Sequence, residues 1–169
     1  MIVVNASLRR MNMNIVLAVD DSRYAEEVLQ FVLKQHWFDN AHFTILHVIE
    51  PMMVGSYLSV LPSPIIDEIK ERAQKTGTEL LNNIAAKLRQ SHPEAEVNIE
   101  LIEGFAREEI INFAKKWPAE LVIVGSHGRT AVMSLLLGSV SQAVVTTAPC
   151  PVLVVRCKSD DLPMWPRSH

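Results

Sequence analysis

The stretch from Val122 to Ser141, VIVGSHGRTAVMSLLLGSVS, decides the fold that this sequence predicts. With Leu121 before it, the stretch opens on four consecutive aliphatic residues, which is typical of a strand buried on both faces of a parallel sheet. The glycines then follow the spacing G-x2-G-x9-G-S, from Gly125 to Ser139. The residues after Ser139 have the composition of a helix. The stretch therefore predicts a strand, a glycine-containing loop and a helix, in that order.

A strand, a glycine-containing loop and a helix start in this order are suited to binding an anion. Glycine lets the backbone take left-handed conformations and approach a ligand closely. A helix N-terminus presents unpaired N–H groups and a partial positive charge, where phosphates bind well. Ser139 and Ser141 are available to satisfy such N–H groups with their hydroxyls, and Arg129 is the one cation of the loop. The alternative is that these are ordinary turn glycines, because neither G-x4-G-K-[ST] nor G-x-G-x-x-G is present.

Length and composition set the broad class. The chain has 169 residues, of which 49% are apolar and 21% charged, as expected of one globular domain. The formal net charge of -3 argues against nucleic-acid binding, which needs a basic face. No apolar run approaches the roughly 18–20 residues of a membrane span. Cys150 and Cys157 would flank a short strand with their side chains well separated, so we expect reduced thiols and a cytoplasmic protein. From the short apolar runs, we expect no membrane insertion.

Apolar periodicity along the rest of the chain predicts alternating strands and helices. A loop is expected from Met52 to Pro64, and Ser22 is the expected N-cap of the first helix. The expected strands are Asn14–Val19, His42–Ile49, Val97–Ile102, Leu121–Val124 and Pro151–Arg156; the expected helices run from Ser22 to about Gln35, from Pro64 to about Gln90, from Ala106 to Trp117 and from Ser139 to about Thr147.

This alternation predicts a single three-layer α/β domain, with a parallel sheet between two layers of helices. In such a fold, a ligand binds beyond the carboxyl ends of the strands, where the strand order reverses. We expect the ends of the first and fourth strands, at Asp20 and Gly125, to meet there.

Four stretches of the chain resemble the universal stress protein family, and specifically its ATP-binding branch. They are IVLAVDDS (15–22), ILHVIEP (45–51), EGFAREEIINFAKKWPAELVIVGSHGRT (103–130) and LLLGSVSQAVVTTAPCPVLVV (135–155). The resemblance implies a universal stress protein domain over residues 14–157, between an N-terminal extension (1–13) and a C-terminal tail (158–169). It also implies a five-stranded parallel sheet of order 3-2-1-4-5, of the Rossmann-like type.

The resemblance further implies a nucleotide site. Asp20 would lie by the ribose, the backbone at Val48 by the adenine with Ala18 nearby, and the glycine loop by the phosphates. Asp20 capping a helix and His127 positioning the backbone are the structural alternatives, and His47 reads as a core histidine. The implied ligand is ATP, with Mg²⁺ or Mn²⁺ on its phosphates. The implied contact residues are Ala18, Val19, Asp20, Val48, Val124, Gly125, Ser126, His127, Gly128, Arg129, Gly138, Ser139, Val140 and Ser141.

These observations predict an ATP-binding regulatory module of the stress response with little or no hydrolysis. Phosphoryl transfer needs a positioned base and a clamp of metal-binding carboxylates, and the sequence has no recognisable set of this kind. A slow ATPase and a protein-interaction module that binds no nucleotide are the alternatives. The apolar last strand, Val152–Val155, predicts a homodimer paired along that edge, as the family usually forms, alongside a regulated protein partner.

Overall fold

The computed structural model describes residues 13–51, 63–128 and 137–156. Within them, every strand pairing is parallel and the strands form one sheet of order β3-β2-β1-β4-β5. The predicted sheet and its strand order are confirmed. The strands are β1 (Asn14–Val19), β2 (His42–Ile49), β3 (Glu96–Glu103), β4 (Leu121–Gly125) and β5 (Val152–Val155).

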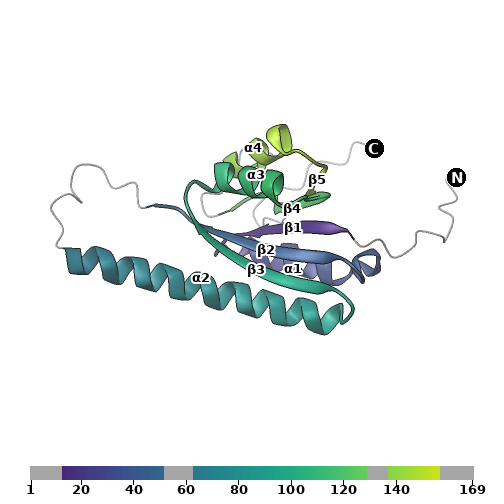
Figure 1. The fold of residues 1–169 in the computed structure, drawn as a ribbon, viewed down its shortest axis with the longest axis horizontal. Coiled ribbons are helices and arrows are strands. Elements are labelled where there is room, and N and C mark those ends of the chain that lie inside the picture. Colours follow the sequence, from purple (N-terminus) through teal and green to yellow (C-terminus); the bar gives the residue numbers. More distant parts are fainter. Residues whose placement is uncertain (1–12, 52–62, 129–136, 157–169) are drawn as a thin grey trace, which may run out of the picture.

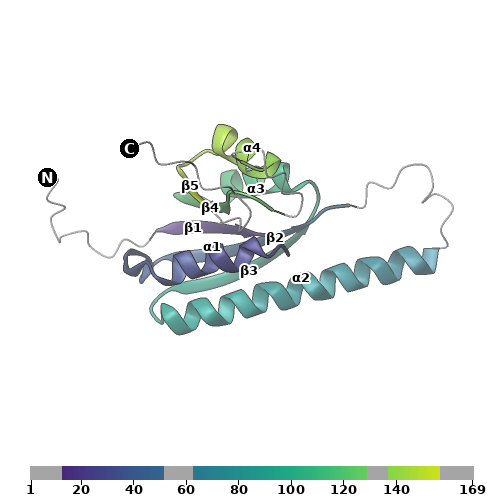
Figure 2. The ribbon, with the colours of Figure 1, turned by 180° about the vertical axis from the view of Figure 1, so that it is seen from behind.

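Helices cover both faces of this sheet (Figure 1), and the reverse view shows the same layers (Figure 2). One layer holds α1 (Tyr24–Leu33), the short 3-10 helix η1 (His36–Phe38) and α2 (Ser63–Ser91). The other holds α3 (Ala106–Lys116) and α4 (Ser139–Thr147). No helix within these described residues is long and apolar enough to span a bilayer.

Side chains of the central strands alternate between two apolar cores, as the period of a strand requires. In β1, Ile15 and Leu17 pack into the core under α1 and α2, whereas Val16 and Ala18 pack into the core under α3 and α4. Strand β4 is buried from Leu121 to Val124. Burial on both faces explains why these strands are continuous aliphatic runs in the sequence.

The start of α1 differs from the prediction. The helix begins at Tyr24, and no side chain caps it at its N-cap residue, Arg23. The N–H and hydroxyl of Ser22 both donate to Asp20 Oδ1, at 3.2 and 2.5 Å, and the N–H of Tyr24 reaches Ser22 Oγ at 3.3 Å. The Asp20 carboxylate thus closes a turn before the helix. Ser22 lies one residue before the assigned N-cap, but its hydroxyl still accepts the N–H of the first helical residue, as a capping residue does.

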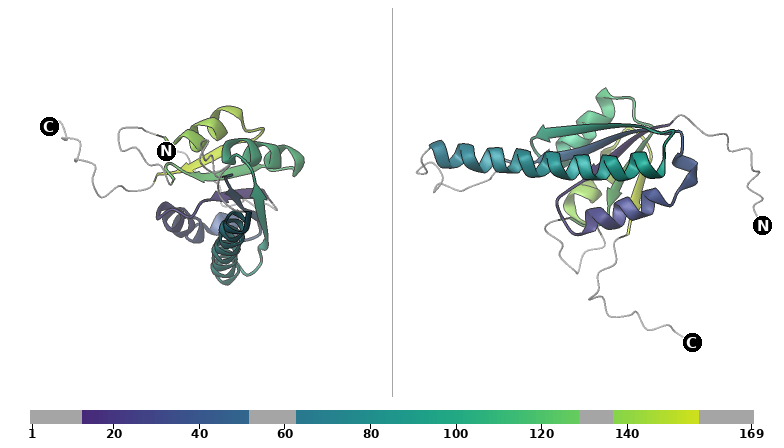
Figure 3. Two further views of the ribbon diagram at one scale, coloured as in Figure 1. Left: turned by 90° about the vertical axis from the view of Figure 1, so that its left-hand side faces the viewer. Right: turned by 90° about the horizontal axis from the view of Figure 1, so that it is seen from below.

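Helix α2 lies close against the sheet at Gly77. A Cβ there would lie 2.8 Å from Leu101 Cδ1 and 3.0 Å from His47 Cδ2, which explains a glycine in the middle of a helix. His47 is 5% exposed and its Nδ1 lies 2.9 Å from the carbonyl oxygen of Val19, so it is a core histidine, as expected. The N-terminal part of α2 extends beyond the end of the sheet (Figure 3).

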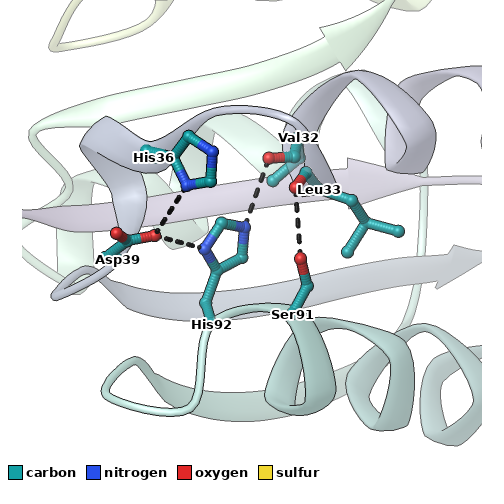
Figure 4. A network of polar contacts seen from close by, with 6 residues as sticks. All are labelled: Val32, Leu33, His36, Asp39, Ser91 and His92. Carbon is teal, nitrogen blue, oxygen red and sulfur yellow. Dashed lines mark hydrogen bonds and ion pairs between the residues drawn. The ribbon is translucent and has the colours of Figure 1, made fainter.

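The amino ends of the strands carry a polar network that joins α1 to α2 (Figure 4). The His92 side chain is 1% exposed. Its Nδ1 lies 2.9 Å from Asp39 Oδ1 and its Nε2 lies 3.3 Å from the Val32 carbonyl oxygen. The Ser91 hydroxyl donates to the Leu33 carbonyl at 3.1 Å. Carbonyl groups at the C-terminal end of α1 are therefore satisfied by residues at the end of α2.

Three expectations fall largely or wholly on residues outside those that the structure describes. The N-terminal extension (1–13) is described only at Met13, and the loop expected at Met52–Pro64 is described only at Ser63 and Pro64, which belong to α2. The C-terminal tail (158–169) lies entirely outside the described residues, as do Arg129 and Cys157.

Candidate functional site

A cleft opens at the carboxyl ends of β1 and β4, the adjacent strands between which the sheet order reverses. Its volume is about 180 Å³. Asp20 follows β1 and lies against Gly128, which follows β4. The meeting of these two strand ends, expected from the sequence, is present in the structure.

Most of the residues that the resemblance implied line this one cleft. Ser126 is 2% exposed and lies behind the cleft surface, and Arg129 is outside the described residues. The implied residues found in the lining are Ala18, Val19, Asp20, Val48, Val124, Gly125, His127, Gly128, Gly138, Ser139, Val140 and Ser141.

The cleft also contains residues that the sequence reasoning missed. They come from the first turns of α1 and α3 and from the end of β2, which face the same edge of the sheet. The place of Glu50 directly after a predicted strand was a usable signal, because carboxyl ends of parallel strands share one edge. The missed residues are Tyr24, Ala25, Val28, Leu46, Glu50, Ala106 and Ile110.

Backbone hydrogen bonds hold both ends of the glycine loop. The Ser126 N–H donates to the Val155 carbonyl of β5 at 2.8 Å, and the Gly138 N–H donates to the Ser126 carbonyl at 2.8 Å. The Ser141 hydroxyl donates to the Gly125 carbonyl at 2.6 Å. These three bonds fix the start of α4 beside the end of β4.

The expectation that Ser139 or Ser141 caps α4 with its hydroxyl is wrong. The N-cap residue is Gly138, and no side chain caps the helix there. Ser141 instead uses its hydroxyl as the donor to the Gly125 carbonyl, and Ser139 is exposed. Since no side-chain oxygen occupies the N-cap position, the first turn of α4 presents its N–H groups at the cleft.

The loop glycines serve close approach and not left-handed backbone. Among the described residues, positive φ occurs only at Gly104, at 155°. A Cβ on Gly128 would lie 2.5 Å from Asp20 Oδ2, closer than the two atoms can approach, whereas a Cβ on Gly138 would meet the Ser126 carbonyl at an ordinary 3.5 Å. A side chain on Gly128 would therefore displace the Asp20 carboxylate, even without a ligand.

Two carboxyl groups give the described lining its charge. Asp20 is engaged by Ser22, and Glu50 Oε1 accepts the Ala106 N–H at 3.2 Å, at the start of α3. The described residues contain no group of three His, Cys, Asp or Glu side chains placed to hold a metal ion.

Cys150 packs, partly buried, against the core under α3 and α4, and it is not among the residues that line the cleft. Burial raises the pKa of its thiol, which fits a small apolar role and not a nucleophilic one.

The fold and the cleft together define a doubly wound α/β domain of the Rossmann-like type, open at its switch point. The sequence model of the universal stress protein family matches residues 11–156. The chain belongs to the universal stress protein family.

Relatives agree with this assignment. Universal stress protein YxiE of Bacillus subtilis is 32% identical over 145 residues, which cover 83% of this chain and 97% of YxiE. Among solved structures, hypothetical protein MJ0577 is 28% identical with a TM-score of 0.73, over 89% of this chain and 99% of that one. A family member from Arabidopsis thaliana, solved with AMP bound, is 18% identical with a TM-score of 0.65, over 90% and 96% of the two chains.

Proposed function

We propose that the protein binds ATP in the cleft between the ends of β1 and β4 and acts as a nucleotide-dependent regulatory module of the stress response. The observation that carries the proposal is the packing of Gly128 against the Asp20 carboxylate, beside the uncapped start of α4. The Asp20 carboxylate, which suits ribose hydroxyls, and the backbone N–H groups at the start of α4, which suit phosphates, then face the same cavity.

The cleft lining favours one orientation of the ligand. Val48, Ala106 and Ile110 form an apolar region suited to the adenine ring. Asp20 takes the ribose, and the backbone of Gly125–Gly128 and Gly138–Ser141 takes the phosphates. Mg²⁺ or Mn²⁺ bound to the phosphates offsets their charge beside the two carboxylates of the lining.

Slow or absent hydrolysis follows from how the carboxylates are used. Asp20 closes the turn before α1, and Glu50 accepts an N–H at the start of α3. Each carboxylate already has a hydrogen-bonding role in the fold, whereas phosphoryl transfer needs a positioned base and a clamp of metal-binding carboxylates. A slow ATPase and an interaction module without nucleotide are the competing functions that the test below separates.

The AMP-bound Arabidopsis relative gives the proposal only general support. At 18% identity, the likeness shows a shared fold and not a shared ligand. The case for ATP therefore depends on the cleft of this chain. A cytoplasmic location and a regulated protein partner are parts of the same proposal, consistent with the free thiol of Cys150 and a chain whose net charge is -3.

The first test is the nucleotide content of the purified protein. Denatured protein is expected to release ATP at close to one per chain, identified by ion-exchange chromatography, because a ligand that survives purification is bound tightly and hydrolysed slowly. ADP alone would favour the ATPase. Absence of nucleotide, together with no heat on titration with Mg·ATP, would reject nucleotide binding.

We also propose a homodimer through β5. This strand ends the described sheet and pairs there with β4 alone. Pro151 and Val155 direct their carbonyls to β4, so the alternation of the strand turns the N–H of Val154 toward the outer edge.

Val154→Pro removes that outer N–H and is expected to convert a dimer into a monomer, because proline blocks pairing at an edge. Size-exclusion chromatography with light scattering reads the mass directly. A wild-type monomer at micromolar concentration would reject the dimer. A variant that remains dimeric would show that the dimer interface is not at β5.

A further inference from the structure

The outer edge of β3 is the longer of the two edges of the described sheet (Figure 1). Strand β3 has eight residues, whereas β5 has four. The N–H of Glu96, the first residue of β3, and that of Gly104, just after the strand, both donate toward the β2 side, at 3.1 and 3.0 Å. The residues between them whose backbone groups point outward, by the alternation of a strand, are Val97, Ile99, Leu101 and Glu103.

Helix α2 occupies one end of this edge with a cationic side chain. Arg89 Nη2 donates to the outward carbonyl of Val97 at 2.6 Å. Hydrogen bonds from an ionised donor are stronger than those between neutral groups. Farther along the edge, no side chain of the described residues is bonded to the backbone of Ile99 or Leu101, and β3 pairs there with β2 alone. An unpaired row of backbone donors and acceptors is a template for another strand.

The side chains beside this edge differ between the two faces of the sheet. On the face toward α2, Ile99 and Leu101 are half-buried against the core. On the opposite face, Glu96, Asn98 and Glu100 are all exposed, so α3 does not cover them. A strand added to this edge would therefore meet an apolar surface on one face and a carboxylate surface on the other.

Charge separates the partners that the two edges of the sheet can accept. Strand β3 carries Glu96, Glu100 and Glu103 and no Lys or Arg, whereas β5 has no charged residue. Two copies of β3 paired with each other would bring carboxylates together, and like charges on neighbouring strands are destabilising. Strand β5 has no such repulsion. The β3 edge is thus unsuited to a second copy of this chain and suited to a strand that carries cations.

We propose that the outer edge of β3 is a docking site for an extended segment of a partner protein, in which Lys or Arg alternates with apolar residues. Strand addition of this kind takes its affinity from backbone hydrogen bonds and its specificity from alternate side chains. The cations of the segment lie beside Glu96 and Glu100, and its apolar side chains lie beside Ile99 and Leu101. The inference gives a chemistry to the protein partner of the proposed function, and it does not depend on nucleotide binding.

The test measures the fluorescence anisotropy of a labelled peptide of about eight alternating Lys and Val residues, titrated with the full chain. Two control peptides separate pairing from charge attraction. A peptide with Glu in place of Lys is expected to bind at least about tenfold more weakly. The Lys and Val peptide with every backbone nitrogen methylated keeps its charge and side chains but cannot donate to the edge, and it is also expected to bind at least about tenfold more weakly.

Variants of the protein test the residues named. Glu100→Lys is expected to weaken the Lys and Val peptide about fivefold, because it replaces an attraction by a repulsion. The same charge change at Glu71, exposed on α2, is the matched control and is expected to have less than about a twofold effect. Arg89→Ala frees the Val97 carbonyl and removes a like charge, so it is expected to strengthen binding about twofold or more.

Several outcomes would overturn the inference. They are absence of binding, equal binding of the methylated peptide, which would mean charge attraction alone, and an equal loss in Glu71→Lys. A dimer that Ile99→Pro converts to a monomer, and Val154→Pro does not, would assign this edge to a second copy and would also overturn it. None of these results bears on the nucleotide released from the purified protein, so the proposed nucleotide site stands or fails separately.

Discussion

Gly128→Ala is expected to weaken Mg·ATP binding by about 100-fold or more, equivalent to about 2.7 kcal/mol. The added Cβ would lie 2.5 Å from Asp20 Oδ2, so either the carboxylate or the loop must move. Both are proposed ligand contacts, and either movement removes one of them. The same crowding is expected to lower the free energy of unfolding by about 1–3 kcal/mol. Calorimetry measures the first effect and urea unfolding the second.

A double-mutant cycle with Asp20→Ala isolates the cause. If the collision is with Asp20, removing the carboxylate relieves it, and the stability losses of the two single variants are expected to sum to more than the loss of the double variant. Gly138→Ala is the matched stability control, because its Cβ meets the Ser126 carbonyl at 3.5 Å. Unchanged affinity in Gly128→Ala would place the nucleotide elsewhere, and additive stability losses would show that Asp20 is not what the methyl group meets.

His92→Ala is expected to lower the free energy of unfolding by about 3 kcal/mol, or the melting temperature by about 6–12 °C. The substitution leaves a cavity next to Phe43, whose ring centroid is 6.4 Å from that of His92. It also removes the hydrogen bonds of the ring to Asp39 and to the Val32 carbonyl. Urea unfolding and calorimetric melting both report this loss.

His36→Ala serves as the control for this variant. The His36 side chain is 92% exposed and its Nδ1 lies 3.9 Å from the same Asp39 oxygen, so its removal is expected to change stability by less than about 0.5 kcal/mol. Nucleotide affinity is expected to be unaffected in either variant, because Asp39 and His92 precede β2 and β3 at their amino ends, whereas the cleft lies at the carboxyl ends of the strands. Similar stabilities for the two variants would show that the buried contacts of His92 do not hold α1 to α2.

The secondary structure followed from local pattern. Runs such as Leu121–Val124 are aliphatic because both faces of their strands are buried, and that requirement is visible in a few consecutive residues. The strand order came from the resemblance to a family. The same two sources brought together Asp20 and Gly128, since the ends of parallel strands share an edge.

What the sequence did not predict depends on competition between neighbours in space. Ser22 was a sound N-cap by residue type, but it lies one residue before the assigned N-cap, where the Asp20 carboxylate takes its N–H and hydroxyl. Ser141 was a sound helix-start residue, but the Gly125 carbonyl takes its hydroxyl. Tyr24 lines the cleft from the start of α1, and His92 contacts Asp39, which is 53 residues away in the sequence. No spacing along the chain encodes such contacts.

Helix α2 is one continuous helix, but its two halves are expected to differ in local stability. From residue 64 to residue 76 it has no buried side chain, whereas from Gly77 onward one face is buried against the sheet. The exposed half depends on intrinsic helix propensity and on surface pairs such as Glu68 with Arg72, and an isolated helix of that length is marginal in water. We therefore expect the first half to open and re-form without the rest of the domain, with Gly77 as the boundary of the cooperative unit.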